Sequence, residues 1–457
     1  MVIRSDLLGG PAVENDPGEL RGAWFPGPIP RPSRALLTAT GYVAGCLAAV
    51  LVLLALPAGR SVWDSLWAED GKVFLSQSLT AHWYSPVFRP SEGYMHLVPR
   101  LFGFGARVFP VSDAAVLFGV GSAVLRALLA LFVFRASAGH VRSAPLRAFL
   151  AVFLILVPSG ETLDNVANLH WYLLYAAIWA ALWRPASRWE NAMAAIVVAA
   201  AVCSDPLTLI IAPIVLARCI TLRRRRDHLV TAGFLVATVV QLTVVAGASR
   251  VQVRPVGWVE ILRAYDARIL VALLTGHSAA GHLVTGSLRI AVLLLAVVLL
   301  AMVLLPGLRA DRPTAALVLY LIAASLVLFA LGWRHSLGTV ARPSRDLNGN
   351  SRYDVVPMLL VVTAIVVGMK SVLSRSAIGH RVRLRLAGTG VAVAVVLAAA
   401  ALSISSVSGA NAGPTWRARL DLARHACRTT TMALVAVPVD PGPPWAARIP
   451  CARLTAR

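Results

Sequence analysis

Residues 114–135 read AAVLFGVGSAVLRALLALFVFR, an apolar run whose one internal charge is Arg126. As a helix, such a run spans the roughly 30 Å hydrocarbon core of a bilayer, which needs about 20 residues. Over all 457 residues, 58% are hydrophobic and only 14% are charged. A soluble domain of this size cannot cover so much apolar surface. The sequence therefore predicts an all-α polytopic integral membrane protein whose principal partner is the lipid bilayer.

Similar runs recur along the chain and predict about 11 transmembrane helices. They lie near residues 35–57, 114–135, 146–158, 169–184, 190–203, 205–221, 229–249, 285–305, 314–333, 354–373 and 386–408. The runs 190–203 and 205–221 are short for a bilayer, and Ser204-Asp205-Pro206 separates them. We interpret them as two crossings joined by an outer turn, because one long helix would place the arginines at 223–226 outside.

The basic residues predict the orientation of these helices. A net charge of +22 suits a protein that binds nucleic acid, but most of the arginines lie in short, alternate connections. That is the positive-inside pattern of membrane proteins, so we expect no nucleic acid partner. It predicts a multi-pass protein of the bacterial plasma membrane, with a cytoplasmic N-terminus and an extracytoplasmic C-terminus.

The acidic residues follow the opposite distribution. Beyond residue 34, only Glu190, Asp227 and Asp311 fall in predicted cytoplasmic connections, and the others lie in or beside outer ones. Asp and Glu contribute little to membrane orientation. Their position therefore indicates an outer surface that has a function.

The chain divides into three predicted parts. Residues 1–34 are rich in Gly and Pro, are of mixed charge and predict a disordered cytoplasmic tail. Residues 35–408 form the transmembrane domain, with a long outer loop at 58–113. Residues 409–457 form a small extracytoplasmic tail, too short for a catalytic domain. We interpret this tail as a structural cap or a wall beside the acceptor, with a short strand near 432–438.

Two of the five cysteines, Cys427 and Cys451, lie in this C-terminal tail. The compartment predicted for the tail permits disulfides, and the other cysteines lie in apolar runs, where they suit the role of small core residues. The sequence predicts a Cys427–Cys451 disulfide, and the alternative is two free thiols.

The first outer loop holds two adjacent carboxylates, Glu69 and Asp70, after Trp67 and Ala68. Adjacent side chains on a helix point roughly 100° apart, so one can face a cavity while the other bonds to backbone or an arginine. Partial desolvation raises the pKa of a carboxylate in a cavity and makes it a usable base. The alternative is an ordinary solvated carboxylate in a turn.

The end of this loop, residues 94–109, predicts a helix that lies in the membrane interface. One of its faces is polar or small: His96, Arg100, Gly103 and Arg107. The other face is apolar: Leu97, Leu101, Phe104 and Val108. We expect the polar face to point toward water.

The second outer loop, residues 159–171, is polar and has no Arg or Lys. Its polar side chains are candidates for a cavity wall that hydrogen-bonds hydroxyl groups: Glu161, Asp164, Asn165, Asn168 and His170. The spacing of Glu161, Asn165 and Asn168 predicts one face of a helix, and the alternative is helix capping by Asp164 or Asn165. His170 lacks a His-x-x-His partner, so the sequence assigns no metal ligand.

A later outer loop carries Arg352-Tyr353, with Pro357 four residues on. The planar guanidinium of arginine matches the oxygens of a phosphate, so Arg352 is a candidate anchor for a lipid phosphate. The alternative is an arginine whose charged end simply reaches the interface.

Together these features resemble the GT-C superfamily of membrane glycosyltransferases. The resemblance rests on Trp67-Ala-Glu69-Asp70 in a long loop after the first helix, interfacial helices, a second acidic outer loop and Arg352-Tyr353-x-x-x-Pro357. It implies transfer of a sugar from a polyprenyl phosphate, with Asp70 as the base, or Glu69 if the loop register differs. It implies Arg352 and Tyr353, with Arg100, as the groups that meet the donor phosphate. Beyond this lipid-linked donor substrate it implies no certain cofactor, and it leaves a divalent metal open.

The acceptor is then a glycan, lipid or protein of the cell envelope. Two other classes of function compete with this one. A transporter or flippase of lipid-linked glycans also has many helices and interrupted segments, although this sequence shows no inverted repeat and little charge at helix centres. The third class is a scaffold for envelope assembly without catalytic activity.

Overall fold

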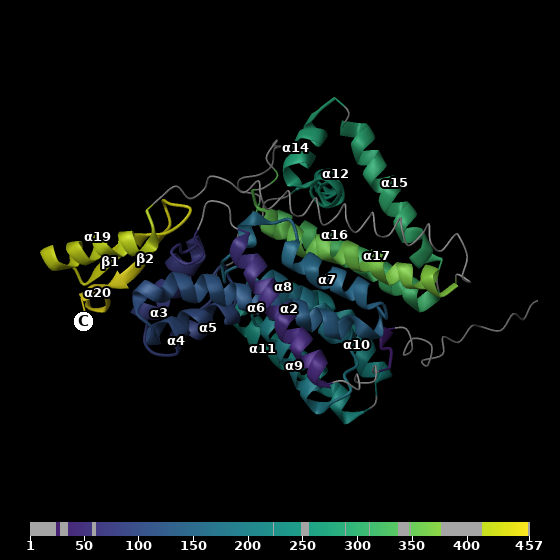
Figure 1. The fold of residues 1–457 in the computed structure, drawn as a ribbon, viewed down its shortest axis with the longest axis horizontal. Coiled ribbons are helices and arrows are strands. Elements are labelled where there is room, and N and C mark those ends of the chain that lie inside the picture. The colour runs from purple at the N-terminus through teal and green to yellow at the C-terminus, as the bar shows by residue number, and fades with distance from the viewer. Residues whose placement is uncertain are drawn as a thin grey trace, which may run out of the picture.

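The computed structural model describes residues 24–27, 35–56, 61–222, 224–247, 256–287, 289–309, 311–336, 347, 349–375 and 414–455. Most of these residues are helical (Figure 1). The helices of the main body are α2 (Ala35–Ala55), α6 (Ala114–Ala136), α7 (Ala144–Leu156), α8 (Leu169–Leu182), α9 (Arg188–Val202), η6 (Pro206–Ile211), α10 (Ala212–Thr221), α11 (His228–Ala246), α15 (Arg289–Leu308), α16 (Arg312–Ser336) and α17 (Val355–Arg375). Each apolar run of the sequence is helical over most of its described residues, except 386–408, which lies outside the described residues.

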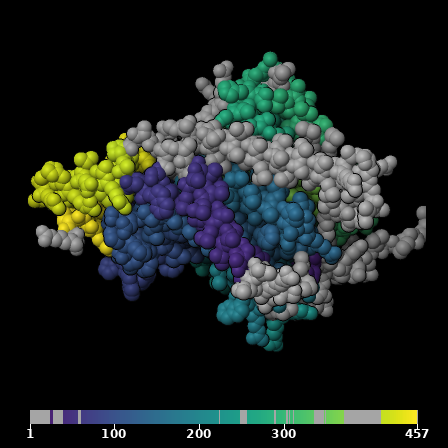
Figure 2. All heavy atoms as spheres, viewed as in Figure 1, coloured from purple at the N-terminus to yellow at the C-terminus, as the bar shows by residue number. Residues whose placement is uncertain are grey.

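Among the described residues, four stretches are long and apolar enough to cross a membrane: Val111–Gly139, His228–Ala246, Arg312–Arg334 and Ser351–Met369. Several other apolar helices are shorter: Ala39–Ala55, Ala144–Leu156, Leu169–Leu182 and Pro206–Thr221. The chain is thus a membrane protein, and the 11 predicted crossings are not confirmed. Figure 2 shows α2 along the outside of the body, where Val43, Leu47 and Leu51 are exposed, as suits contact with lipid.

Helix α8 is the centre of the body. Every residue of α8 is buried, as expected for a helix that is apolar on all sides. It packs against α6, α9, α10 and α17. Because the second loop leads directly into α8, the residues at the start of this helix are held by the core.

A buried arginine fixes the other end of the second loop. Arg126 of α6 donates hydrogen bonds to the carbonyls of Leu154 and Ile155, at 3.0 and 2.8 Å, and its guanidinium lies 4.0 Å from the centre of the Tyr172 ring. The last carbonyls of a helix have no partner within it, so Arg126 satisfies the end of α7, from which the second loop runs.

The first outer loop folds into short helices. They are η1 (Asp70–Leu75), α3 (Ser76–Thr80), α4 (Ser85–Phe88), α5 (Leu97–Gly105), η2 (Ala106–Val108) and η3 (Val111–Asp113). Further short elements are η4 (Ser137–Gly139), η5 (Gly160–Thr162), η7 (Arg225–Asp227), α12 (Trp258–Tyr265), η8 (Asp266–Val271), α13 (Ala272–Thr275), α14 (His277–Thr285) and η9 (Ser351–Asp354).

The prediction that the polar face of residues 94–109 points toward water is wrong. Arg100 is only 1% exposed, whereas Val108 is 80% exposed. Arg100 donates a 2.6 Å hydrogen bond to Oε1 of Gln77, and a Cβ at Gly103 would lie 2.6 Å from the carbonyl oxygen of Phe74. The polar face turns inward because its partners lie inside the protein.

The C-terminal segment forms a compact cap, which we define as residues 414–455. It contains α19 (Trp416–Thr429), β1 (Leu434–Pro438), β2 (Ala446–Pro450) and α20 (Cys451–Thr455). The strands pair antiparallel, with Leu434 opposite Pro450 and Pro438 opposite Ala446. This hairpin corrects the all-α prediction for the chain as a whole, although a strand near 432–438 was expected.

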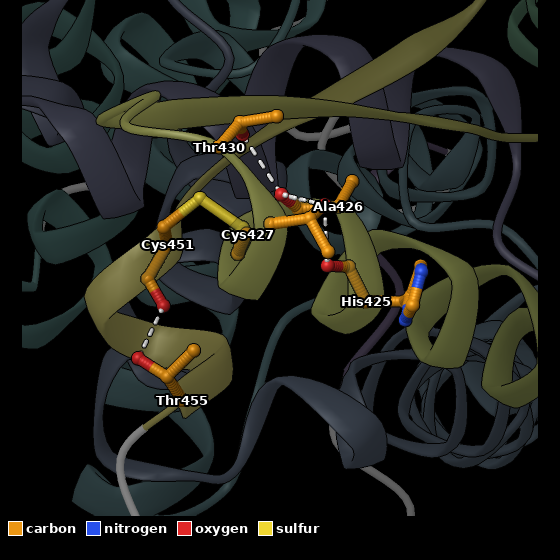
Figure 3. The surroundings of a disulfide bond; sticks show 7 residues. His425, Ala426, Cys427, Thr430, Cys451 and Thr455 are labelled. Atoms are coloured by element: carbon orange, nitrogen blue, oxygen red, sulfur yellow. Dashed lines mark hydrogen bonds between the residues drawn. A yellow bond between two sulfur atoms is a disulfide. The ribbon is translucent and has the colours of Figure 1, made fainter.

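A disulfide links two helices of the cap, and hydrogen bonds attach the cap to the first loop. Cys427 of α19 and Cys451 of α20, the predicted pair, form a disulfide (Figure 3). The Arg448 N–H donates to Oγ of Ser76 at 2.8 Å, and the Asp440 N–H donates to the Leu66 carbonyl at 2.9 Å. In Figure 1 the cap lies at one end of the helical body, beside α3 and α5.

Part of the predicted disordered tail is packed. Phe25 is 1% exposed, and Nε1 of Trp24 donates a 3.0 Å hydrogen bond to the Pro313 carbonyl at the start of α16. The expectation of disorder is therefore wrong for residues 24–27, and the rest of 1–34 lies outside the described residues.

Replacing Arg126 tests how the end of α7 is held. Arg126→Met keeps much of the side-chain volume but removes the hydrogen-bond donors. We therefore expect the free energy of unfolding to fall by roughly 1–3 kcal/mol for each carbonyl left without a partner. Thermal unfolding in detergent measures this loss. Arg142→Met is the matched control, because Arg142 is exposed. Equal midpoints for the two variants would contradict the assignment.

Candidate active site

Six separate segments of the chain line one cavity of about 610 Å³. They are the first loop, the second loop with the start of α8, the start of η6 with the residue before it, α16 at Leu331 and Gly332, the segment around η9, and the cap. The polar and aromatic residues of the lining are Trp67, Glu69, Phe74, Ser91, Glu92, Tyr94, His96, Glu161, Asn168, His170, Trp171, Asp205, Asn350, Arg352, Tyr353 and Trp445. A cavity of this size accommodates a small organic ligand.

The adjacent carboxylates of the first loop have different environments. Asp70 is completely buried. It accepts hydrogen bonds from the backbone N–H groups of Ala167 and Val166, at 2.8 and 2.9 Å, one on each carboxylate oxygen. Glu69 lines the cavity, and its Oε2 has no hydrogen-bond partner among the described residues. Glu69, which the resemblance implied as the alternative to Asp70, lines the cavity, and Asp70 does not.

Arg352 lies between two carboxylates. Its Nη1 is 3.6 Å from Oε1 of Glu69 and 4.0 Å from Oε1 of Glu161. Both distances exceed a normal hydrogen bond, so the guanidinium can also meet a ligand. The Arg352 backbone N–H donates to Oε2 of Glu161 at 3.3 Å. Burial raises the pKa of Glu161, against the opposing effect of Arg352.

A buried ion pair positions the segment that carries Arg352. Arg268 of η8 donates to both carboxylate oxygens of Asp354, at 2.9 to 3.1 Å, and Nε2 of His277 lies 2.9 Å from the same carboxylate. Arg268 also donates to the Gly349 carbonyl at 2.9 Å. These contacts hold residues 349–354 against η8 and α14.

The polar residues of the second loop do not form one helical face. Only η5 is helical before α8 begins at Leu169, and Asp164 has a left-handed backbone with φ of 53°. Asn165 donates to the carbonyls of Glu161 and Leu163, and its Oδ1 accepts from Asn168. The helical spacing was misleading because the asparagine amides satisfy the loop backbone instead.

Some of the predicted site residues therefore line the same cavity, and others do not. The cavity brings together six of them: Glu69, Glu161, Asn168, His170, Arg352 and Tyr353. The remaining ones are outside its lining: Asp70, Arg100, Asp164 and Asn165. Arg100 is turned away because it bonds Gln77, and burial lowers its pKa to about 10.

Asp205 is the clearest residue that the sequence failed to assign to the site. It caps the start of η6, where its Oδ1 accepts the Leu207 N–H at 2.8 Å, and it is 2% exposed. Burial raises the pKa of Asp205 to about 7. The interruption of two apolar runs located this turn, but nothing in the sequence placed it beside His170, whose Nε2 is 3.6 Å from Asp205 Oδ2.

Three further residues of the cavity lining were not predicted from the sequence: Tyr94, His96 and Trp445. The ring of Tyr94 stacks on that of His96 with centroids 4.1 Å apart, and Trp445 reaches the cavity from the cap. Within the part of the chain that the structure describes, no group of three or more His, Cys, Asp or Glu residues is arranged to hold a metal ion.

No protein-family model and no curated protein matches this chain. Among solved structures, it is similar to the Archaeoglobus fulgidus oligosaccharyltransferase, in a crystal structure described as a complex with Zn and sulfate. The TM-score is 0.41 at 14% sequence identity, over 85% of this chain and 55% of the archaeal one. The chain thus spans about half the length of that protein, and a proposal of function has to rest on the cavity's own residues.

Asp70→Ala tests the link between the two loops. This substitution leaves the Val166 and Ala167 N–H groups without their acceptor. Each unpaired group should lower the free energy of unfolding by roughly 1–3 kcal/mol. We expect a lower unfolding midpoint and faster hydrogen exchange at residues 166–167 in mass spectrometry. Asp421→Ala on the exposed face of α19 should change neither. Unchanged exchange in Asp70→Ala would contradict the link.

Asp205→Asn tests the buried carboxyl through pH. Asp205 stays protonated in the folded protein up to about pH 7, but it ionises in the unfolded chain above its ordinary pKa of 3.8. Rising pH between these values therefore favours unfolding of the wild type. We expect Asp205→Asn to gain relative stability from pH 4 to 7, on the order of a few kcal/mol, and then to level off. A difference in melting temperature that is independent of pH would contradict this.

Proposed function

We propose that the protein is a membrane glycosyltransferase that moves a sugar from a polyprenyl phosphate to an acceptor hydroxyl. The observation that carries this proposal is Glu69 beside Arg352 at the cavity. It combines a carboxylate oxygen without a hydrogen-bond partner in the described residues with a guanidinium 3.6 Å away. The predicted orientation puts the reaction on the extracytoplasmic side of a bacterial plasma membrane, with a glycan, lipid or protein of the envelope as acceptor.

The lining of the cavity suits a carbohydrate. Trp67, Trp171 and Trp445 supply flat apolar surfaces, which match the C–H faces of a sugar ring. Carboxylate and amide groups from Glu161 and Asn168 supply acceptors and donors for its hydroxyls. The combination of aromatic walls and a few convergent polar groups is typical of ligand sites in general.

The position of Arg352 suits a donor carried on a lipid. Arg352 lies in the first turn of the apolar stretch Ser351–Met369, at the end of a helix long enough to cross the bilayer. Basic residues at such positions meet the phosphates of lipid headgroups. A polyprenyl phosphate that diffuses in the membrane can therefore present its phosphate to Arg352 with its chain still in lipid.

The chemistry of transfer uses these two groups. Glu69 takes the proton of the acceptor hydroxyl as the acceptor oxygen bonds to the anomeric carbon. The bond from that carbon to the phosphate oxygen breaks, and its electron pair leaves with the polyprenyl phosphate. Arg352 meets the charge that develops on this leaving group. Glu161 lies near the same Nη1 and accepts the Arg352 backbone N–H, and so helps to position it.

Glu69→Gln provides the test of this proposal. We would measure sugar transfer and donor hydrolysis in nanodiscs with a panel of radiolabelled polyprenyl-phosphate sugars. Removal of a general base costs typically 10²–10⁴-fold in turnover, and donor binding should persist because Arg352 remains. Glu260→Gln, on an exposed position of α12, should keep the wild-type rate.

Two outcomes would overturn the proposal. If the wild type neither binds nor turns over any donor, a transporter or a scaffold explains the chain better. If Glu69→Gln stays fully active while a folded Asp70→Asn is inactive, the base is Asp70 as the resemblance implied.

A further inference from the structure

Two residues of the cavity lining, His170 and Asp205, each carry a buried polar atom without a hydrogen-bond partner among the described residues. Nε2 of His170 and Oδ2 of Asp205 are 3.6 Å apart, which is too far for a hydrogen bond between them. Neither atom has a hydrogen-bond partner in the described residues, and the two residues are 6% and 2% exposed. An unsatisfied buried polar atom costs roughly 1–3 kcal/mol, so a pair of them in one cavity indicates a ligand group.

The other atoms of both side chains are occupied. Nδ1 of His170 lies 2.7 Å from the Ala167 carbonyl oxygen, so Nδ1 carries the hydrogen and donates it. The neutral ring then presents a lone pair at Nε2. Oδ1 of Asp205 accepts from the Leu207 N–H, which leaves Oδ2 as the oxygen that faces the histidine.

The two atoms together match one hydroxyl group. A hydroxyl donates one hydrogen bond and accepts others. With a pKa near 7, Asp205 is largely protonated in mildly acidic solution. Its O–H can then donate to the ligand hydroxyl, while the ligand O–H donates to Nε2 of His170. When Asp205 is ionised, both protein atoms are acceptors, and only one of them can receive the hydroxyl hydrogen.

The backbone on both sides of the pair is held rigidly. The N–H groups of Leu97 and Val98, in α5, donate to the Cys203 carbonyl and to Oγ of Ser204, both at 3.1 Å. Ala167, which accepts from His170, donates its own N–H to Asp70. These contacts, with the bonds of His170 to Ala167 and of Asp205 to Leu207, position both side chains at the gap between Nε2 and Oδ2.

We propose that His170 and Asp205 form a subsite that binds one ring hydroxyl of the transferred sugar and so determines which sugar is accepted. The subsite rests on the proposed glycosyl transfer, and its two residues come from other segments of the chain than Glu69 and Arg352. A site built to bond a hydroxyl rejects an analogue that lacks it, because its buried polar atoms are then left unpaired.

Two substitutions of His170 distinguish the roles of its two ring nitrogens. In His170→Asn the amide nitrogen can replace Nδ1 and keep the bond to Ala167, but nothing replaces Nε2. In His170→Gln the longer amide can replace Nε2. Both variants avoid opening a large hole, and equal unfolding midpoints would establish that both are folded.

The experiment measures donor affinity in the Glu69→Gln background, where turnover does not consume the ligand. The probes are the polyprenyl-phosphate sugar that the wild type uses best and its set of monodeoxy analogues. We expect one deoxy position to bind at least tenfold more weakly than the parent sugar. This discrimination should disappear in His170→Asn and in Asp205→Ala, return in part in His170→Gln, and persist in Glu260→Gln.

The outcomes separate this inference from the proposed function. If the parent donor binds and is transferred, but discrimination against every deoxy analogue survives in His170→Asn and Asp205→Ala, the subsite is wrong and the transferase stands. If no donor binds, the proposed function fails first. Tight binding of Zn²⁺ alone, lost in His170→Asn and Asp205→Ala, would overturn the subsite in favour of a metal site.

Discussion

The site depends on one buried carboxylate, that of Asp70, and on the two backbone N–H groups that it accepts. Burying a charged carboxylate is costly unless hydrogen bonds replace its water, and the Val166 and Ala167 bonds do this directly. They join the first loop to the entry of α8, two segments nearly a hundred residues apart. Because Asp70 points inward, Glu69 is turned to the cavity. Ala167, held by its own N–H, in turn positions His170.

A second buried carboxylate, Asp354, plays the matching part for the segment of Arg352. Its bonds to Arg268 and His277 tie the segment of Arg352 to helices η8 and α14. Neither Asp70 nor Asp354 lines the cavity. The groups that face the ligand are therefore positioned by charges that never touch it, as expected where a reacting geometry must be held closely.

Local patterns in the sequence predicted the features that depend on neighbouring residues. Apolar runs became helices, the Glu69–Asp70 pair was divided between cavity and backbone, and the C-terminal tail contains a hairpin and the Cys427–Cys451 disulfide. The prediction failed where a polar residue finds its partner in a distant segment. Arg100 turned inward to Gln77, and Asp205 met His170, because those contacts exist only after the helices have packed. The helical spacing also gave a wrong prediction for Asn165, whose side chain donates hydrogen bonds to the backbone of its own loop.

The cap has a consequence for how the protein matures in the membrane. Pro441 and Trp445 form part of the cavity wall, and the ring of Trp445 covers Lys72 of the first loop at 4.7 Å. The cap comes after every membrane helix of the chain that the structure describes, so a ribosome makes it after them. The loops that carry Glu69 and Arg352 thus reach their side of the bilayer before the wall that closes over them. Synthesis of the cap, and its delivery to the same side as these loops, adds the wall that Pro441 and Trp445 supply, so a chain halted before the cap lacks that wall.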